Sequence, residues 1–307
     1  MRAAIYKKYG PPEVLHLQEW KKPTPKDHEV LVKVHTTTVT AGDVRMRKFD
    51  VPKMEWLFAR LYLGVFGPRR KVLGMELAGE IEAVGKKVTR FQVGDAVFGG
   101  TFWVGLGGYG EYLCFPEDKM LAFKPEGMSF EEAAALPIGG LTALRLLKKA
   151  KLESGQSILI YGASGSVGSY AVQLAKNMGT KVTAVCSTAN LEWVKDLGAD
   201  EVIDYTKGDI TQSKERYDVV FDAVAKLPSS KGKSLIKKGG RFIHAHETPA
   251  KGQDDEDLTY LVQLFEEGKI KVIVDRTYPL EDIVEAHRYV EQGRKKGNVV
   301  IQVASIA

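Results

Sequence analysis

The chain has 307 residues, with 44 lysines and arginines against 39 aspartates and glutamates, so its formal charge of +5 is a mild excess. Its length exceeds one average domain, and 44% hydrophobic with 27% charged residues is ordinary globular composition, so we expect two domains with separate cores. Only two cysteines are present, which excludes a disulfide framework and a cysteine-based structural zinc site.

The sequence gives no sign of a membrane segment or a nucleic-acid surface. No apolar run approaches the length of a spanning helix, and the first thirty residues contain no continuous apolar stretch typical of a signal peptide. We therefore expect a cytoplasmic protein without a membrane partner. Short basic clusters at 69–71 and 294–296 are interpreted as solvated surface, so no nucleic-acid partner is expected.

The first 118 residues predict a β-rich domain with many loops, punctuated by glycine and proline. Three runs have the composition of strands, over 29–39, 76–84 and 95–98. Short helical pieces are expected only near 54–63. The aromatic-rich segment 51–70 fits the wall of an apolar substrate cleft, and it fits equally an aromatic cluster in a core or dimer contact.

From Ser129 onward the pattern changes to alternating helices and strands. Ser129 and Glu132 fit a capping box that opens a helical stretch running to Lys149. The acidic run 254–257 is interpreted as the first turn of a later helix. The remaining signals predict strands over 157–161, 181–186, 201–203, 218–221 and 241–244, and helices over 166–178 and 190–197. This alternation predicts an α/β domain with a parallel, doubly wound sheet.

The loop between the first strand and helix of that domain, residues 162–168, is rich in glycine and reads GASGSVG. A dinucleotide pyrophosphate must approach backbone amides at the helix N-terminus, and side chains at the turn would block it. A strand precedes this loop and an amphipathic helix follows it. This context favours a dinucleotide-binding loop over a glycine-rich turn that only allows the helix to pack on the sheet. The predicted cofactor-binding residues of the loop are Ala163, Ser164, Gly165, Ser166, Val167 and Gly168.

The end of the second strand indicates which dinucleotide is bound. An NAD site usually has Asp or Glu there, about 20 residues past the glycine motif, to bind the ribose hydroxyls. This chain has Cys186, Ser187 and Thr188 instead, with no carboxylate to repel a 2′-phosphate. Ser187, Thr188 and Asn190 can donate hydrogen bonds to that phosphate, so NADP(H) is the predicted cofactor.

Three longer stretches carry a family resemblance: 74–85 (GMELAGEIEAVG), 91–99 (FQVGDAVFG) and 198–205 (GADEVIDY). Together with the glycine loop they resemble the zinc-less quinone oxidoreductase and enone reductase branch of the medium-chain dehydrogenase/reductase superfamily. The resemblance covers essentially the whole chain. It implies a GroES-like catalytic domain from residues 1–118 and 274–307, a Rossmann NADP(H)-binding domain over 119–273, and a homodimer.

The resemblance also implies site positions. Zinc-containing members of the superfamily hold zinc with a Cys and a His at the places of Ala41 and Met75, so no metal is expected. Thr142 would lie beside the nicotinamide, although a threonine inside a helix also fits a bond to its own backbone. Tyr205 would help bind the 2′-phosphate, although it also fits a packed aromatic. The remaining predicted cofactor positions are Ala223, Val224, His244 and Asn298.

The function implied is an NADPH-dependent, zinc-independent oxidoreductase that transfers hydride to a quinone or an α,β-unsaturated carbonyl compound. Because the cofactor performs the chemistry, the protein has to align the acceptor, exclude water and meet negative charge on the carbonyl oxygen. The candidate catalytic residues are Thr40, Asp43, Arg45, Tyr109 and Thr142. Two alternatives stay open: an NADPH-binding structural or RNA-contacting protein with little turnover, and an enoyl-thioester reductase with a basic channel at 69–71.

Overall fold

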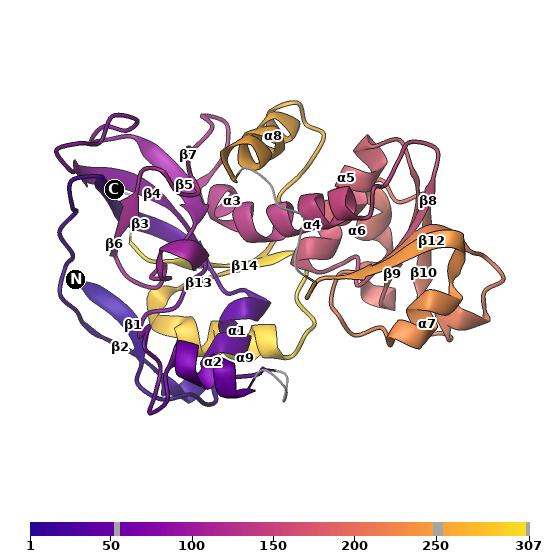
Figure 1. Cartoon of the computed structure of the whole chain (residues 1–307), viewed down its shortest axis with the longest axis horizontal. Coiled ribbons are helices and arrows are strands. Elements are labelled where there is room, and N and C mark those ends of the chain that lie inside the picture. Colours follow the sequence, from indigo (N-terminus) through magenta and orange to yellow (C-terminus); the bar gives the residue numbers. More distant parts are fainter. Residues whose placement is uncertain (52–55, 248–253, 305–307) are drawn as a thin grey trace. The chain divides into compact units, whose positions relative to one another are not determined.

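The computed structural model describes residues 1–51, 56–247 and 254–304 (Figure 1). The chain divides into two compact units, one of Met1–Pro137 with Val274–Ala307 and the other of Ile138–Ile273. Over the described ranges, the chain forms no helix with the length and apolar character needed to cross a bilayer.

The first unit is built on a largely antiparallel sheet with the strand order β13-β14-β3-β4-β5-β7, to which β6 adds by pairing with β3. Its strands are β3 (Glu29–Thr38), β4 (Glu76–Val84), β5 (Ala96–Gly100), β6 (Tyr112–Pro116), β7 (Leu121–Phe123), β13 (Val274–Pro279) and β14 (Asn298–Gln302). A separate antiparallel pair consists of β1 (Arg2–Tyr6) and β2 (Leu15–Glu19). The strands predicted at 29–39, 76–84 and 95–98 are confirmed within two residues.

The same unit contains α1 (Ala41–Lys48), α2 (Trp56–Leu63), α3 (Phe130–Ala135), α9 (Ile283–Glu291) and the short 3-10 turns η1 (Pro12–Val14), η3 (Phe102–Val104) and η6 (Leu280–Asp282). The capping box at Ser129 is confirmed, since the Ser129 hydroxyl accepts from the Glu132 N–H at 3.1 Å. The helix ends at Ala135 rather than continuing, because Pro137 starts a new one. The sequence places the cofactor-binding domain from residue 119, whereas contacts such as Thr36 Oγ1 to Phe130 O keep α3 in the first unit.

The second unit contains a five-stranded parallel sheet, ordered β10-β9-β8-β11-β12. Its strands are β8 (Ser157–Tyr161), β9 (Lys181–Cys186), β10 (Glu201–Asp204), β11 (Tyr217–Asp222) and β12 (Ile236–His244). Its helices are α4 (Pro137–Lys149), α5 (Ser166–Asn177), α6 (Leu191–Asp196), α7 (Ser229–Ser234), α8 (Asp254–Glu266), η4 (Thr188–Asn190) and η5 (Ile210–Gln212). The predicted α/β class is confirmed. The strand order reverses at β8, where open α/β sheets bind their ligands.

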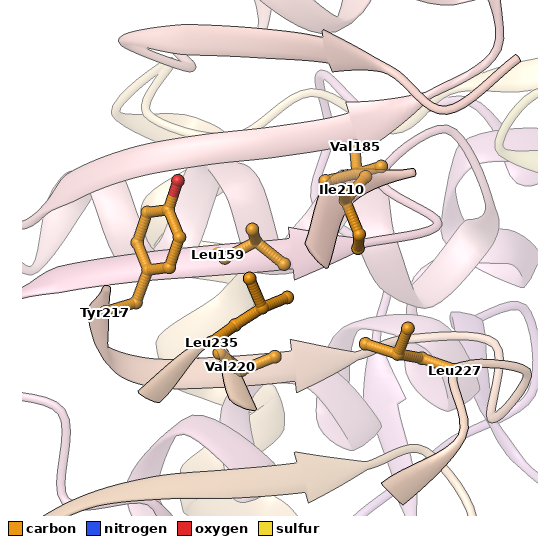
Figure 2. Packing of buried hydrophobic residues seen from close by; sticks show 7 residues of the cluster. All are labelled: Leu159, Val185, Ile210, Tyr217, Val220, Leu227 and Leu235. Carbon is orange, nitrogen blue, oxygen red and sulfur yellow. The ribbon is translucent and has the colours of Figure 1, made fainter. Parts of the chain in front are cut away.

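A buried cluster fixes one face of this sheet. Figure 2 shows side chains from three neighbouring strands, β9, β8 and β11, packed together with residues of the following segments. The members are Leu159, Val185, Ile210, Tyr217, Val220, Leu227 and Leu235. Burying one such leucine or valine is worth about 1.5–3 kcal/mol, so the cluster holds the strand ends in place.

Candidate active site

In the first unit, α1 begins at a buried carboxylate. Thr40 is the N-cap, and its hydroxyl accepts from the Asp43 N–H at 3.0 Å while donating to Asp43 Oδ2 at 2.6 Å. The Thr40 N–H donates to the same oxygen at 3.0 Å, and the Gly74 N–H donates to Asp43 Oδ1 at 2.9 Å. The structure therefore brings together two of the predicted catalytic residues, in a capping box.

Asp43 is wholly shielded from solvent, and this burial raises the pKa of its carboxyl to about 6 although several hydrogen bonds favour the charged form. The Thr40 hydroxyl has a single proton, which it gives to Asp43 while that carboxyl is ionised. Thr40 can donate to another oxygen only when Asp43 is protonated. The pair is thus a hydrogen-bond donor whose availability depends on pH.

The residues around the start of α1 do not form a typical zinc site. Met75 Sδ lies 3.4 Å from the Thr40 hydroxyl, and a Cβ placed on Gly42 would come within 2.6 Å of that sulfur. Zinc in proteins prefers cysteine, histidine and carboxylate ligands, whereas Thr40, Asp43 and Met75 offer a hydroxyl, one carboxylate and a thioether. Nowhere in the described ranges do three or more His, Cys, Asp or Glu residues gather as a possible metal site.

Tyr109 lies deeper than a substrate-facing residue would. It is fully buried, and its hydroxyl lies 3.1 Å from Nε2 of His287 in α9. Burial lowers the pKa of His287 to about 3, so the ring is neutral, and burial followed by the Asp43 charge raises the pKa of Tyr109 well above its usual value. Tyr109 is thus joined to a histidine that the sequence did not single out.

The structure does not bring Arg45 to Asp43. Its Nε donates to the Asp50 carbonyl at 3.4 Å, near the end of α1. The arginine on the buried face is Arg47, which forms an ion pair with Glu291 where α1 and α9 pack side by side (Figure 1). Burial lowers the pKa of Arg47 to about 10. The spacing of four residues between Asp43 and Arg47 was the sequence signal for this, because such residues share a helix face.

In the second unit, the loop between β8 and α5 is built without side chains where a phosphate would approach. Gly162 has a φ of +77°, and Gly165 is the N-cap of α5 with no side-chain cap, so the first-turn amides of the helix keep their donors for a ligand. A Cβ on Gly168 would lie 2.2 Å from the Gly162 carbonyl oxygen, so residue 168 has to be glycine for α5 to pack this close to the loop. Ser164, Ser166 and Val167 are partly exposed along the same loop. The loop fits a dinucleotide pyrophosphate.

The interpretation that no carboxylate lies at the end of β9 is wrong. The parallel register of β10 on β9 places Asp204 opposite Cys186. The Thr188 hydroxyl donates to Asp204 Oδ2 at 2.5 Å, and hydrogen bonds from Thr188 and then Thr206 lower the pKa of Asp204. The acidic side chain arrives from the next strand rather than from β9 itself, so spacing along the sequence did not reveal it.

Ser187 and Asn190 form one unit beside this carboxylate. Asn190 Nδ2 donates to the Ser187 hydroxyl at 3.0 Å, and Asn190 Oδ1 accepts from Trp193 Nε1 at 2.9 Å. Asn190 therefore positions Ser187, whose own proton stays available. Tyr205 is 47% exposed, with its ring centroid 6.1 Å from that of Tyr161, so it is an aromatic packed on one side and open on the other.

Thr142 and His244 have polar atoms that no described residue satisfies. The Thr142 hydroxyl of α4 makes no hydrogen bond within the described ranges, so the alternative of a bond to its own backbone is not observed. Nδ1 of His244, at the end of β12, is buried without a hydrogen-bond partner among the described residues. Its ring centroid lies 6.4 Å from that of His246.

The other predicted cofactor positions are placed as follows. The Ala223 N–H donates to the Tyr161 carbonyl at 2.9 Å, and Val224 occupies the space that a Cβ on Gly162 would need. Both residues follow β11 at the same edge of the sheet as the glycine loop. Asn298 begins β14 in the first unit and is 4% exposed.

Comparisons with known proteins agree with this arrangement. Residues 26–126 match the alcohol dehydrogenase GroES-like domain, and residues 166–273 and 246–301 match two families described as zinc-binding dehydrogenase. The 2-methylene-furan-3-one reductase of Solanum lycopersicum is 35% identical over 98% of this chain and 79% of its own length. The NADPH-dependent alkenal/one oxidoreductase of Arabidopsis thaliana is 33% identical over the same shares.

Among solved structures, the quinone oxidoreductase from Coxiella burnetii superposes with a TM-score of 0.86 at 29% identity, covering 99% of each chain. The glycine loop, the two units and these relatives lead to one assignment. The chain belongs to the medium-chain dehydrogenase/reductase superfamily, in the branch of quinone oxidoreductases and enone reductases, and is an oxidoreductase that uses a nicotinamide cofactor.

Proposed function

We propose that the chain is an NADPH-dependent, zinc-independent reductase of quinones or α,β-unsaturated carbonyl compounds. The observation that carries the proposal is the glycine-rich loop between β8 and α5, where Gly165 begins the helix with no side-chain cap on its first-turn amides. Its relatives include proteins named for 2-methylene-furan-3-one, alkenal and quinone reduction. These names support an electron-poor conjugated carbonyl as the acceptor class.

The choice of NADPH is supported by donors at the adenosine end. Ser187 keeps a free proton because Asn190 donates to its oxygen, and the exposed side of Tyr205 faces no competing partner in the described ranges. The Asp204 charge opposes a 2′-phosphate, but it is hydrogen-bonded to two threonine hydroxyls and lies 3.9 Å from Lys207 Nζ. We therefore propose a preference for NADPH that is modest in size.

The nicotinamide, when bound, supplies the hydride, and the chain's residues arrange the reaction around it. We propose that Thr142 contacts the nicotinamide, since its hydroxyl has no hydrogen-bond partner among the residues that the structure describes. Thr40 would give its proton to the acceptor's carbonyl oxygen as negative charge develops there, while the proton of neutral Asp43 moves onto the Thr40 oxygen and leaves Asp43 as a carboxylate. Arg47 and the Tyr109–His287 pair support the helix that holds Asp43.

Zinc independence is supported by the side chains at the two places where zinc-containing members of the superfamily have ligands. Ala41 has no donor atom, and the Met75 thioether is a soft ligand that zinc seldom takes. Carbonyl polarisation is therefore assigned to hydrogen bonding from Thr40 rather than to a Lewis acid.

The test is oxidation of NADPH and NADH, followed by absorbance, with 9,10-phenanthrenequinone, 1,4-benzoquinone and a short 2-alkenal, each with and without a chelator. We expect turnover that resists chelation and favours NADPH. Turnover with an enoyl thioester but not with the free enone would transfer the proposal to thioester reduction. NADPH binding without turnover of any acceptor would support the alternative of a binding protein instead.

A further inference from the structure

Helix α2 has two apolar faces, and only one of them is packed. On the inner face, Trp56 contacts Phe49 with ring centroids 6.0 Å apart, and the Arg60 guanidinium lies 4.6 Å from the Phe49 ring. The Tyr9 hydroxyl donates to the Leu63 carbonyl at 3.0 Å and ties down the end of the helix. These contacts fix the orientation of α2, so its opposite face is the one that is left unpacked.

The outer face of α2 and the residues just after it form an exposed apolar patch. We call Leu57, Phe58, Leu61, Val65 and Phe66 the α2 patch. Phe58 is 75% exposed and Phe66 is fully exposed. The helical members lie at spacings of one, three and four residues, which places them on one side. With Trp56, they make up six of the twelve large hydrophobic side chains exposed among the described residues. A patch of this kind marks an interaction site.

A basic cluster follows the patch directly. The Arg69 N–H donates to the Leu63 carbonyl at 2.8 Å, so the segment 69–71 is tied to the end of α2. Arg69, Arg70 and Lys71 are exposed, and none of them makes a side-chain hydrogen bond or ion pair with any residue in the described ranges. From residue 56 to residue 75 the sequence has no aspartate or glutamate. The segment is thus apolar and cationic with no internal counter-charge.

The cluster also borders a pocket. The pocket has a volume of about 440 Å³ and is lined in part by Trp20, Lys21, Tyr112 and the three basic residues of 69–71. A Cβ on Gly105 would lie 2.7 Å from Arg70 Nη1, so the glycine leaves room for the guanidinium at the pocket wall. Arginine binds phosphate oxygens in a bidentate manner.

We propose that the α2 patch and the basic cluster 69–71 together dock the protein on the surface of an anionic lipid bilayer. Apolar side chains enter the boundary between headgroups and acyl chains, while the arginines bind headgroup phosphates. The absence of acidic residues in this segment favours such a surface over a second protein. The proposal departs from the expectation of no membrane partner, which concerned spanning segments. It does not depend on the acceptor or on turnover.

The experiment is flotation of the full chain with phosphatidylcholine vesicles and with vesicles containing about 30% phosphatidylserine. We expect binding to the anionic vesicles only, weakened when salt rises from about 0.1 M to about 0.5 M. The double variant Arg69→Gln/Arg70→Gln should bind about 30-fold more weakly. The variant Phe58→Ser/Phe66→Ser should bind at least about tenfold more weakly.

Matched control variants test whether binding depends on this site rather than on the protein's overall charge or exposed apolar surface. Lys233→Gln/Lys238→Gln removes two exposed charges from the second unit, and Val84→Ser/Val93→Ser removes two exposed apolar side chains elsewhere. Both should bind as the unchanged protein does, and thermal melting checks that every variant is folded. The proposal is overturned if the unchanged protein ignores anionic vesicles, or if the site variants bind no more weakly than the controls. It is also overturned if inorganic phosphate binds the arginines while vesicles do not, or if the phenylalanines prove necessary only for self-association in sedimentation.

Discussion

Replacing Asp43 by asparagine should change the pH dependence of folding in a predictable direction. The carboxyl is fully buried, and its pKa in the folded protein is raised from 3.8 to about 6. The folded state therefore binds a proton more tightly than the unfolded state between these values, so stability falls as pH rises through this window. At 1.36 kcal/mol per pH unit, the whole difference is about 3 kcal/mol, of which about 2.4 kcal/mol is lost between pH 4 and pH 7.

Urea unfolding between pH 4 and pH 7.5 measures this difference. The free energy of unfolding of the unchanged protein, minus that of Asp43→Asn, should fall by about 2.4 kcal/mol as the pH rises. Asp118→Asn is the control, because Asp118 is exposed and, within the described ranges, its side chain bonds only to the neighbouring Lys119. If the free energies of unfolding of the unchanged protein and of Asp43→Asn change with pH in parallel, the assignment of a buried carboxyl with a raised pKa at this position is refuted.

Three further substitutions test other parts of the structure. Gly168→Ala would place a Cβ 2.2 Å from the Gly162 carbonyl, so the affinity for NADPH, measured by fluorescence titration, should fall more than about tenfold. Gly208→Ala is the control and should keep that affinity, because the space around Gly208 is open. Asp204→Asn removes a charge near the proposed phosphate site and should lower the KM for NADPH by about three- to tenfold, with the KM for NADH unchanged or raised. Tyr109→Phe leaves a buried histidine nitrogen unpaired, so it should cost about 1–3 kcal/mol in urea unfolding and keep kcat within about twofold. Tyr6→Phe should cost less, because the Tyr6 hydroxyl has no hydrogen bond to any described residue. A collapse of kcat in folded Tyr109→Phe would instead assign that hydroxyl to catalysis.

The sequence was sufficient for features encoded by neighbouring residues. The periodicity of β8 and α5 and the glycines between them predict the cofactor loop, because helix, strand and turn preferences are local. The capping box at Ser129 was visible for the same reason. The end of α3 was missed, although Pro137 marks it, because the apolar pattern continues across the break.

Features that depend on pairing between distant segments were not predictable in this way. Asp204 reaches the end of β9 through the register of β10, and His287 reaches Tyr109 across 178 positions of sequence. The spacing of Asp43 and Arg47 places them on one face of α1, but it does not reveal that this face packs against α9 and leaves Arg45 partly exposed. Contacts of this type need the fold before they can be assigned.

The central claim is hydride transfer from NADPH to a conjugated carbonyl without a metal. Its most direct test uses NADPH in which both hydrogens on the reactive carbon of the nicotinamide are deuterium, a 2-alkenal acceptor and a chelator, with the product analysed by mass spectrometry. The account predicts that each molecule of reduced product carries one deuterium on carbon and that its yield equals the NADPH consumed. Consumption of NADPH with no label in the product, or loss of turnover in the chelator, would contradict it.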